Sequence, residues 1–290
     1  MRKAILMATL LVPLVMPPPV RAQTERTIQV RAQTRLELSC ENGSIQIRTW
    51  DQPVIQLRAT HDPAIRIEVD ESPRVITVRA VTPHGKKHGS VAYNVTVPRA
   101  MNLELSAVNA PITVEGAAGR VEANNVRGTV EVRGGTARVE ASSVEGGVTI
   151  IDARGIVEAT TVNAGVVIRN VSGPVEATTV NGGVQLSNVD SRSVEATTVN
   201  GEVVYEGTIH ADGVYSFSSH NGPLTVTVPQ GTNANVSVST FSGAFSAGFP
   251  VSFRQVHGDK SFKFELGTGG AHIELNSFNG TIRLKRPGER

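Results

Sequence analysis

The chain has 290 residues, a formal net charge of +2 and 4% aromatic residues. This near-neutral balance argues against a nucleic-acid partner, which would need a strongly basic surface. The 28 glycines and the abundance of valine, threonine and serine favour an all-β protein with short strands and many turns.

The N-terminus has the features of a secretory signal. Arg2 and Lys3 provide a basic start, residues 4–16 form an apolar run, and Val20-Arg21-Ala22 is a suitable cleavage site. An uncleaved membrane anchor is disfavoured, because the run is too short to span a bilayer and prolines interrupt it. We therefore predict a signal peptide over residues 1–22, export to the periplasm or to the cell surface or medium, and no transmembrane segment in the mature chain.

Residues 23–100 contain short alternating segments separated by prolines. We expect a β-rich cap here, followed by a repeat domain over residues 101–290, because an open first coil would expose unpaired backbone groups. Strands are expected over residues 27–30, 36–39, 44–48, 54–60, 65–69, 75–79 and 90–97. The single cysteine, Cys40, excludes an internal disulfide and is expected to face the core.

Residues 121–205 contain five copies of one motif. Each copy begins Val-Glu-Ala, continues with two Asn, Ser or Thr residues and ends in Val. The copies start at Val121, Val139, Val157, Val175 and Val194, at intervals of 18, 18, 18 and 19 residues. A fixed short period of this kind indicates a repeat fold, in which each unit buries its apolar face against its neighbours.

The alternation within each copy predicts two short strands per coil. Val157 and Ala159 point to one side and Glu158 to the other, and a second apolar pair follows each turn. Hexapeptide β-helices and calcium β-rolls share this period, but the apolar frame and the Gly-Asp motif that they need are missing. We therefore predict a two-sheet, right-handed parallel β-solenoid with about 18–21 residues per coil. The valine that closes each copy is expected in the core, so Val162→Asp should unfold the chain.

The repeat extends beyond the five copies. The turn glycines Gly201, Gly222, Gly243 and Gly280 keep the pattern, but their spacing widens to 21 and then to 37 residues. The later coils are therefore expected to be larger or to carry an insertion. All eight phenylalanines lie between 217 and 278, where we expect core packing rather than an aromatic binding platform.

These features together resemble a known family. The segment Val97-Pro98, the Leu103-Glu104-Leu105 that follows, the repeated Val-x-Ala-x-x-Val-Asn-Gly blocks and the closing run from Ile273 resemble the bacterial adhesin-like domain family of unknown function. The resemblance covers roughly residues 27–286. It implies a secreted or envelope β-solenoid, related to the head domains of auto-transporter adhesins, and it implies no catalytic residues.

An outward row of glutamates is the sharpest candidate site. Stacked coils would place these carboxylates about 5 Å apart, which is unfavourable for like charges. Arg120 and Arg138 are expected to offset two of them, whereas Glu158, Glu176 and Glu195 lack such a neighbour. The row is either a site for divalent cations or a basic partner, or, as we favour, a solvated face that opposes edge aggregation. Its members are Glu104 and the candidate interaction ladder Glu122, Glu140, Glu158, Glu176 and Glu195.

A second row lies at the turns and consists of Asn163, Asn181, Asn200, Gly182 and Gly201. Asparagine beside glycine suits left-handed backbone and an amide ladder along the stack. The threonine pairs that precede these turns resemble flat arrays that bind ice or glycans. However, adjacent threonines cannot both point from one flat face. We therefore assign both rows a structural role.

The sequence contains no recognisable catalytic, phosphate-binding or metal-binding motif. His84 and His88 have helical metal-site spacing, but Pro83 and Gly85 exclude a helix there, so an exposed basic loop is expected. We therefore expect no enzyme activity, no metal and no cofactor.

The first functional hypothesis is an exported, non-enzymatic, adhesin-like binding or scaffold module at the bacterial cell envelope. Its partner would be an envelope glycan, a protein ligand or a second copy of the chain. One alternative is a carbohydrate-active β-helix enzyme, whose site would lie in the irregular residues 206–223 or 247–272. Another is an accessory protein in envelope stress or signalling.

Overall fold

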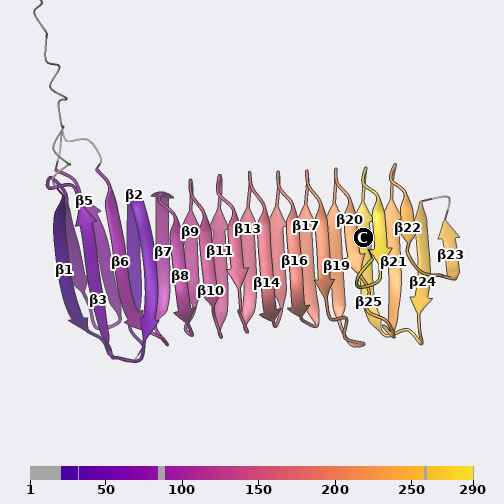
Figure 1. Cartoon of the computed structure of the whole chain (residues 1–290), viewed down its shortest axis with the longest axis horizontal. Helices are drawn as coiled ribbons and strands as arrows, with labels where there is room; N and C mark the ends of the chain where they lie inside the picture. The colour runs from indigo at the N-terminus through magenta and orange to yellow at the C-terminus, as the bar shows by residue number, and fades with distance from the viewer. Residues whose placement is uncertain (1–20, 32, 84–88, 258–259, 290) are drawn as a thin grey trace, which may run out of the picture.

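The computed structural model describes residues 21–31, 33–83, 89–257 and 260–289. In this part of the chain every regular element is a β-strand, and the strands stack along one long axis (Figure 1). Neighbouring strands in the middle of the stack are parallel and in register. The predicted all-β parallel solenoid is confirmed.

The strands form two sheets that share the long strand β2 (Arg35–Trp50). In spatial order, sheet A contains β1 (Ala22–Gln29), β3 (Val54–His61), β6 (Val91–Pro98), β2, β8 (Ile112–Ala117), β10 (Val130–Gly134), β12 (Val148–Ile151), β14 (Val166–Ser172), β16 (Val184–Asp190), β18 (Val203–Gly207), β20 (Leu224–Thr227), β26 (Ile282–Lys285) and β22 (Phe245–Ala247). Sheet B contains β4 (Arg66–Glu71), β5 (Val75–Val81), β2, β7 (Asn102–Asn109), β9 (Val121–Asn125), β11 (Arg138–Ser143), β13 (Ile156–Thr161), β15 (Val175–Thr179), β17 (Ser193–Thr198), β19 (Val214–Ser219), β25 (Ala271–Ser277), β21 (Ala234–Thr240), β24 (Ser261–Leu266) and β23 (Phe253–His257).

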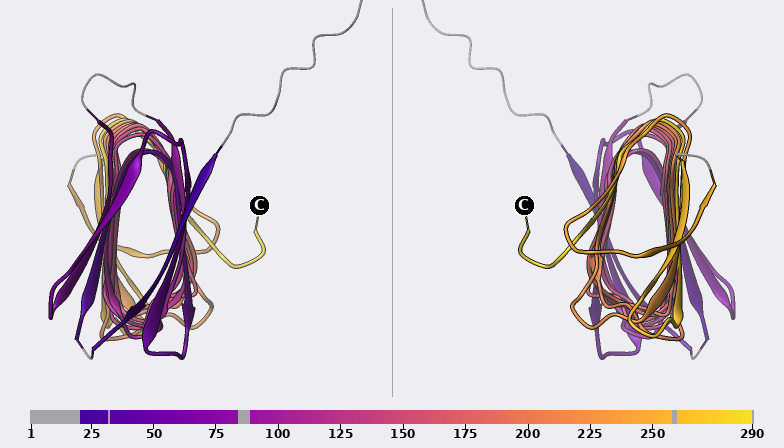
Figure 2. Two further views of the ribbon diagram at one scale, coloured as in Figure 1. Left: turned by 90° about the vertical axis from the view of Figure 1, so that its left-hand side faces the viewer. Right: turned by 90° about the vertical axis from the view of Figure 1, so that its right-hand side faces the viewer.

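The core is a stack of equivalent residues from successive coils. Val139 pairs with Val121 on one side and with Val157 on the other. All three valines are fully buried, and burying a valine contributes about 1.5–3 kcal/mol. Seen end-on, the coils superpose as a flattened oval whose two long sides are the sheets (Figure 2). The repeat therefore fills a narrow apolar space between two sheets along the whole rod.

At the N-terminal end, β2 forms a complete coil. The two strands expected over residues 36–39 and 44–48 are joined through Gly43, whose φ of 134° lets the chain turn from sheet B into sheet A. The β2 coil lies between β5/β6 and β7/β8, and the antiparallel strands β1, β3 and β4 cover the end. One apolar core runs from Ile28 to Leu284, and the division at residue 100 stays a prediction.

At the C-terminal end, the chain returns into its own stack. The last coil, β25/β26, lies between β19/β20 and β21/β22, although β21 and β22 precede it in sequence (Figure 1). The turn glycines therefore follow the spatial order Gly222, Gly280, Gly243. The expected insertion is confirmed, because β23 and β24 lie between Gly243 and Gly280 in the chain. The spatial order of the last coils was not expected, and it makes β21/β22 the outermost parallel coil. The antiparallel strands β24 and β23 lie beyond it.

A row of buried polar side chains ties each coil to the preceding one. Thr161, Thr179 and Thr198 are almost fully buried, and each hydroxyl donates to a turn carbonyl of the preceding coil. For Thr179 the acceptor is the oxygen of Ala164, at 2.8 Å. Each bond satisfies a buried carbonyl in the narrow turn. The inward member of each threonine pair therefore has a structural role.

We expect Thr179→Val to lower the free energy of unfolding by about 1–3 kcal/mol, because the Ala164 carbonyl would lose its buried partner. Thr178→Val is the matched control, since Thr178 lies on the same strand but on the outer, half-exposed side. Urea unfolding followed by circular dichroism measures both values. Equal stabilities for the two variants would contradict the assigned role.

Cys40 faces the core, as expected, and is 3% exposed. Burial raises the pKa of its thiol from 9.0 to about 11. In the next coil the equivalent position is Ala107, so alanine fits this place in the stack.

The raised pKa means that stability is fully present below pH 9 and is lost as the pH rises towards 11. A shift of this size corresponds to about 2–3 kcal/mol. Cys40→Ala should remove this part of the alkaline destabilisation, so the unfolding free energy of the wild type should fall relative to that of the variant between pH 9 and pH 11. Parallel curves from pH 8 to pH 11 would show that the thiol does not titrate in this way.

Candidate interaction surface

The outer face of sheet B and its turn edge carry four rows of side chains along the rod. In the coil of β13 these are Glu158, Thr160, Val162 and Asn163. Strand pairing and turn hydrogen bonds place their equivalents in line. The rows are the Glu ladder (Glu104, Glu122, Glu140, Glu158, Glu176, Glu195), the hydroxyl row (Ser106, Asn124, Ser142, Thr160, Thr178, Thr197, Ser218, Asn276, Ser239), the ridge (Val108, Val126, Val144, Val162, Val180, Val199, His220, Phe278, Phe241) and the Asn ladder (Asn163, Asn181, Asn200, Asn221, Asn279).

The Glu ladder is partly neutralised by three arginines, the first of which is Arg35, 3.7 Å from Glu104. The Arg120 guanidinium lies 3.1 Å from Glu122 and 3.3 Å from Glu140, and Arg138 contacts Glu140 and Glu158. The expectation that Glu158 lacks a neighbour is wrong, because an arginine side chain reaches the next coil. Within the described chain, Glu176 and Glu195 form no ion pair, and both are exposed. The uncompensated negative charge therefore lies over β15 and β17.

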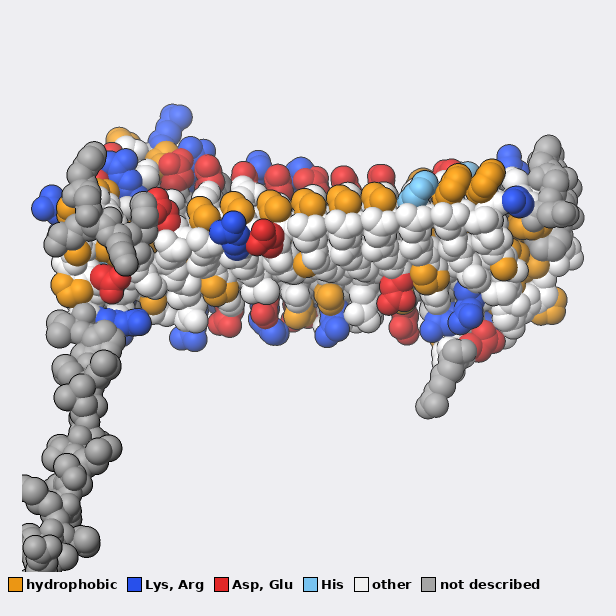
Figure 3. Space-filling model, turned by 90° about the horizontal axis from the view of Figure 1, so that it is seen from above, with side chains coloured by type: hydrophobic (Ala, Val, Ile, Leu, Met, Phe, Trp, Pro, Cys, Tyr) orange, Lys and Arg blue, Asp and Glu red, His pale blue; other side chains and the backbone are white. Residues whose placement is uncertain are grey.

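The ridge is a line of exposed, mainly apolar side chains, seen in Figure 3 as an orange row interrupted by pale-blue histidine. Val162 is 36% exposed and Val126 is 42% exposed. The expectation that the closing valine lies in the core is therefore wrong. The two-residue alternation of β13 places Thr161 inwards and continues through the next residue, so Val162 points outwards.

Aromatic rings extend the ridge at its C-terminal end. The Phe278 ring stacks between His220 and Phe241, with centroid distances of 4.7 and 4.6 Å. Phe241 is the most exposed, at 59%. Core packing is confirmed for Phe217 and Phe264, which are buried. It is wrong for Phe241 and Phe278, which occupy the position that valine holds in the regular coils.

The Asn ladder is a chain of side-chain amides. Asn181 donates to Asn163 at 3.0 Å and Asn200 donates to Asn181 at 2.9 Å. The left-handed backbone expected at these asparagines does not occur, because positive φ among non-glycine residues is found elsewhere in the described chain. Gly182 and Gly201 are required by close approach instead, since a Cβ at Gly201 would lie 2.0 Å from the Gly182 oxygen.

A second amide ladder lies at the opposite turns and was not anticipated from the sequence. Asn188 donates to Asn170 at 2.8 Å, and Asn170 donates to Asp152 at 3.0 Å. These three residues have φ between 52° and 60°. Their signal in the sequence is the 18-residue spacing of Asx residues, which tolerate left-handed backbone.

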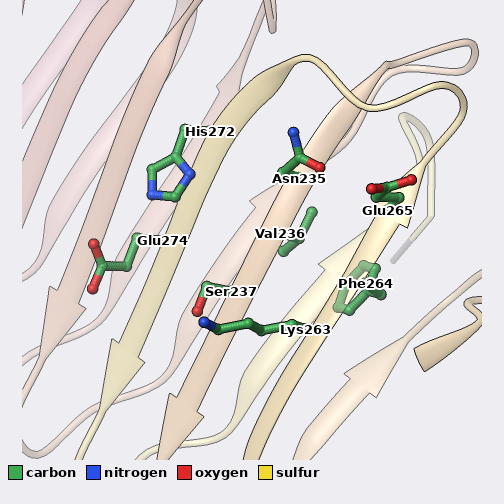
Figure 4. Close-up of a pocket in the computed structure, with 8 residues that line it drawn as sticks. All are labelled: Asn235, Val236, Ser237, Lys263, Phe264, Glu265, His272 and Glu274. Carbon is green, nitrogen blue, oxygen red and sulfur yellow. The ribbon is translucent and has the colours of Figure 1, made fainter. Parts of the chain in front are cut away.

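A groove of about 710 Å³ opens where the Glu ladder meets the irregular coils. Figure 4 shows His272 and Glu274 on β25 beside Asn235 and Ser237 on β21, with Lys263 beyond them on β24. In register, the Glu ladder position continues from Glu195 through Ser216, Glu274 and Ser237 to Lys263. The groove therefore offers donors and acceptors of both charges, in place of one repeated group.

The groove residues could be located from the sequence only in part. Lys263 and His272 fall in the irregular residues 247–272, one of the two segments in which the enzyme alternative would place its site. Asn235, Ser237 and Glu274 fall outside them. Their signal is the loss of the Val-Glu-Ala pattern after Ala196.

Within the described ranges, no three His, Cys, Asp or Glu side chains are grouped closely enough to hold a metal ion. His84 and His88 lie outside the described residues. In the same described ranges, no helix is long and apolar enough to cross a bilayer.

The fold and its ladder surface define a two-sheet parallel β-solenoid. Residues 33–285 match the family model described as Toastrack DUF4097. The chain belongs to this family, which confirms the family resemblance seen in its repeats.

Three solved structures match the chain at low sequence identity. A proposed adhesin from Parabacteroides distasonis ATCC 8503 is 12% identical, with 91% of this chain and 97% of that chain covered and a TM-score of 0.48. A proposed adhesin from Parabacteroides merdae ATCC 43184 is 10% identical, with 90% and 95% covered and a TM-score of 0.48. A Parabacteroides distasonis ATCC 8503 protein named for proposed lipid binding is 10% identical, with 90% and 96% covered and a TM-score of 0.39. No curated protein matches the chain.

The exposed position of Val162 changes the expected effect of its substitution. Val162→Asp should remain folded and lose about 0.5 kcal/mol or less, because the charge stays in water. Val157→Asp, five residues earlier in the same coil, should unfold the chain, because Val157 is fully buried. Far-UV circular dichroism and thermal melting of both variants test the assignment. An unfolded Val162→Asp variant would return Val162 to the core.

Proposed function

We propose that this chain is an exported, non-enzymatic, adhesin-like binding or scaffold module of the bacterial cell envelope. The observation that carries the proposal is the in-register repetition of one chemical group per coil along a rod. An extended partner that touches many coils gains affinity by summing weak contacts. Export is supported by the basic start at Arg2 and Lys3 and the apolar run that follows.

The regularity of the ladder face favours binding over catalysis. Acid–base catalysis needs two titratable groups whose surroundings differ, so that one is protonated and the other is not. Glu176 and Glu195 have the same neighbours in successive coils, since each follows a buried valine and precedes a buried alanine. These two carboxylates therefore lack the difference in surroundings that acid–base catalysis requires. A carbohydrate-active enzyme would instead need the irregular groove.

The groove is the place where the module would select its ligand. The amide of Asn235, the hydroxyl of Ser237 and the carboxylate of Glu274 line one open surface, and Asn276 orients Glu274 through a 2.8 Å hydrogen bond. Such a mixed set of donors and acceptors suits the hydroxyl groups of a glycan chain. We therefore propose an envelope glycan as the ligand class, held at the groove.

A glycan array with the purified chain, together with a reducing-sugar release assay, tests this function. We expect binding to envelope glycans with no released product. The double substitution Lys263→Ala with Glu274→Gln should weaken binding about tenfold or more, since two polar contacts are lost. Glu131→Gln on the outer side of sheet A is the matched control and should bind normally.

Two outcomes would contradict the proposal. Product release that disappears on a single carboxylate substitution would establish the enzyme alternative. Recovery of a tagged copy in the cytoplasmic fraction of its native host would contradict export.

A further inference from the structure

The ridge is not explained by the groove or by the fold. It runs through nine coils, from Val108 to Phe241, and its valines are about 40% exposed. At about 4.8 Å per coil, its length is about 40 Å. Its valine side chains lie outside the space between the sheets, and their exposure to water is unfavourable. Continuous apolar strips of this kind mark interaction surfaces on soluble proteins.

The aromatic end of the ridge argues against a sugar partner. Sugars stack on ring faces, but both faces of Phe278 are covered by His220 and Phe241. The ammonium of Lys260 lies 4.7 Å from the Phe241 centroid, over the remaining face. The stack therefore presents ring edges beside valine methyl groups, which suits an apolar protein surface.

We propose that the ridge is covered by a second copy of this chain, with the two rods parallel and in register around a two-fold axis along the rod. The first argument is spacing. The ridge offers one apolar side chain per coil at about 4.8 Å, whereas an extended peptide repeats every 6–7 Å on one face. A second copy has the same period, so its contacts repeat in every coil.

The second argument is shape. The hydroxyl row beside the ridge consists of small side chains, and at the C-terminal end a hollow of about 480 Å³ lies between the two rows. Ser218 and Ser239 line it on one side, and Val199 and Phe241 line it on the other. In the proposed dimer, the ridge of each copy packs against the hydroxyl row of its partner.

The third argument is charge, which selects the parallel arrangement. Across each coil the order is Glu ladder, hydroxyl row, ridge and Asn ladder. A two-fold axis along the rod reverses this order, so that Glu176 faces the amide level of Asn181 and Glu122 faces the level of Arg127. An axis across the rod would keep the order and place Glu ladder against Glu ladder, where like charges repel.

The available area is sufficient for a stable dimer. A strip about 40 Å long and about 20 Å wide, from Glu ladder to Asn ladder, covers about 800 Å² per copy by the strand dimensions, which is the size of a standard interface.

Sedimentation equilibrium of the purified full chain and of charge variants tests the interface. We expect the wild type at twice the monomer mass, and Val144→Asp with Val180→Asp at the monomer mass with unchanged circular dichroism. Ile156→Asp is the matched control, because Ile156 is 41% exposed at the opposite end of a sheet B strand. It should remain dimeric. A monomeric wild type, or ridge variants that remain dimeric, would overturn the proposal.

Cross-linking tests the direction of the rods without destabilising them. Val126→Cys and Val199→Cys lie four coils apart, about 19 Å along the rod. With a short bis-maleimide, each variant should cross-link to itself, and a mixture of differently tagged variants should give only like-with-like products. Mixed Val126–Val199 products, or none at all, would overturn the parallel register. The buried Cys40 should remain unreacted in every variant.

This inference is independent of the proposed function. The groove residues Lys263 and Glu274 lie outside the ridge, so their substitution should leave the dimer mass unchanged. Conversely, Val144→Asp with Val180→Asp should leave the affinity for a short glycan unchanged within about twofold. The two proposals can therefore fail separately.

Discussion

The constraint on which the structure depends is that each coil completes its backbone hydrogen bonds only through the coils above and below it. A strand pairs in register with its neighbours, so each residue lies on its equivalent, as Val157 lies between Val139 and Val175. A side chain is therefore accepted at a position only if it tolerates its own copy about 4.8 Å away. Valine, alanine and hydrogen-bonding amides meet this condition. Stacked carboxylates repel one another, and arginines offset this repulsion over part of the Glu ladder.

The ends of the rod follow from the same constraint, because a terminal coil has unpaired backbone groups that invite aggregation. Near each end of the rod, one coil lies between two coils that are not both its neighbours in sequence. The β2 coil is held between two others at one end, and β25/β26 is held similarly at the other. Antiparallel strands then close the stack. The β2 coil and the β25/β26 coil thus have hydrogen-bonded strands on both sides, so neither can leave the stack unless other strands move.

The sequence was informative where the stack enforces periodicity and silent where it does not. The spacing of Val-Glu-Ala revealed the coils, their register and the Glu ladder, because alternation along a strand fixes which side chains are buried. The expectation for Val162 failed because it followed residue type: the alternation from Val157 assigns the inward place to Thr161 and the outward place to Val162. The sequence also did not reveal the order of the last coils, because the spacing of a motif along the chain does not fix which coil it stacks against. The groove depends on that order, since β25 carries Glu274 into contact with β21 only by insertion.

A periodic surface and an aperiodic one suit different partners. The regular coils repeat each group with one spacing, so they discriminate poorly among small ligands but match any partner with the same period. A second copy of the chain meets that condition at every coil. The groove has no such repetition, because Ser216, Glu274, Ser237 and Lys263 replace a uniform row of glutamates. Selectivity requires donors and acceptors in a unique arrangement, and it is therefore at the break in the repeat that this protein has the means to recognise one ligand.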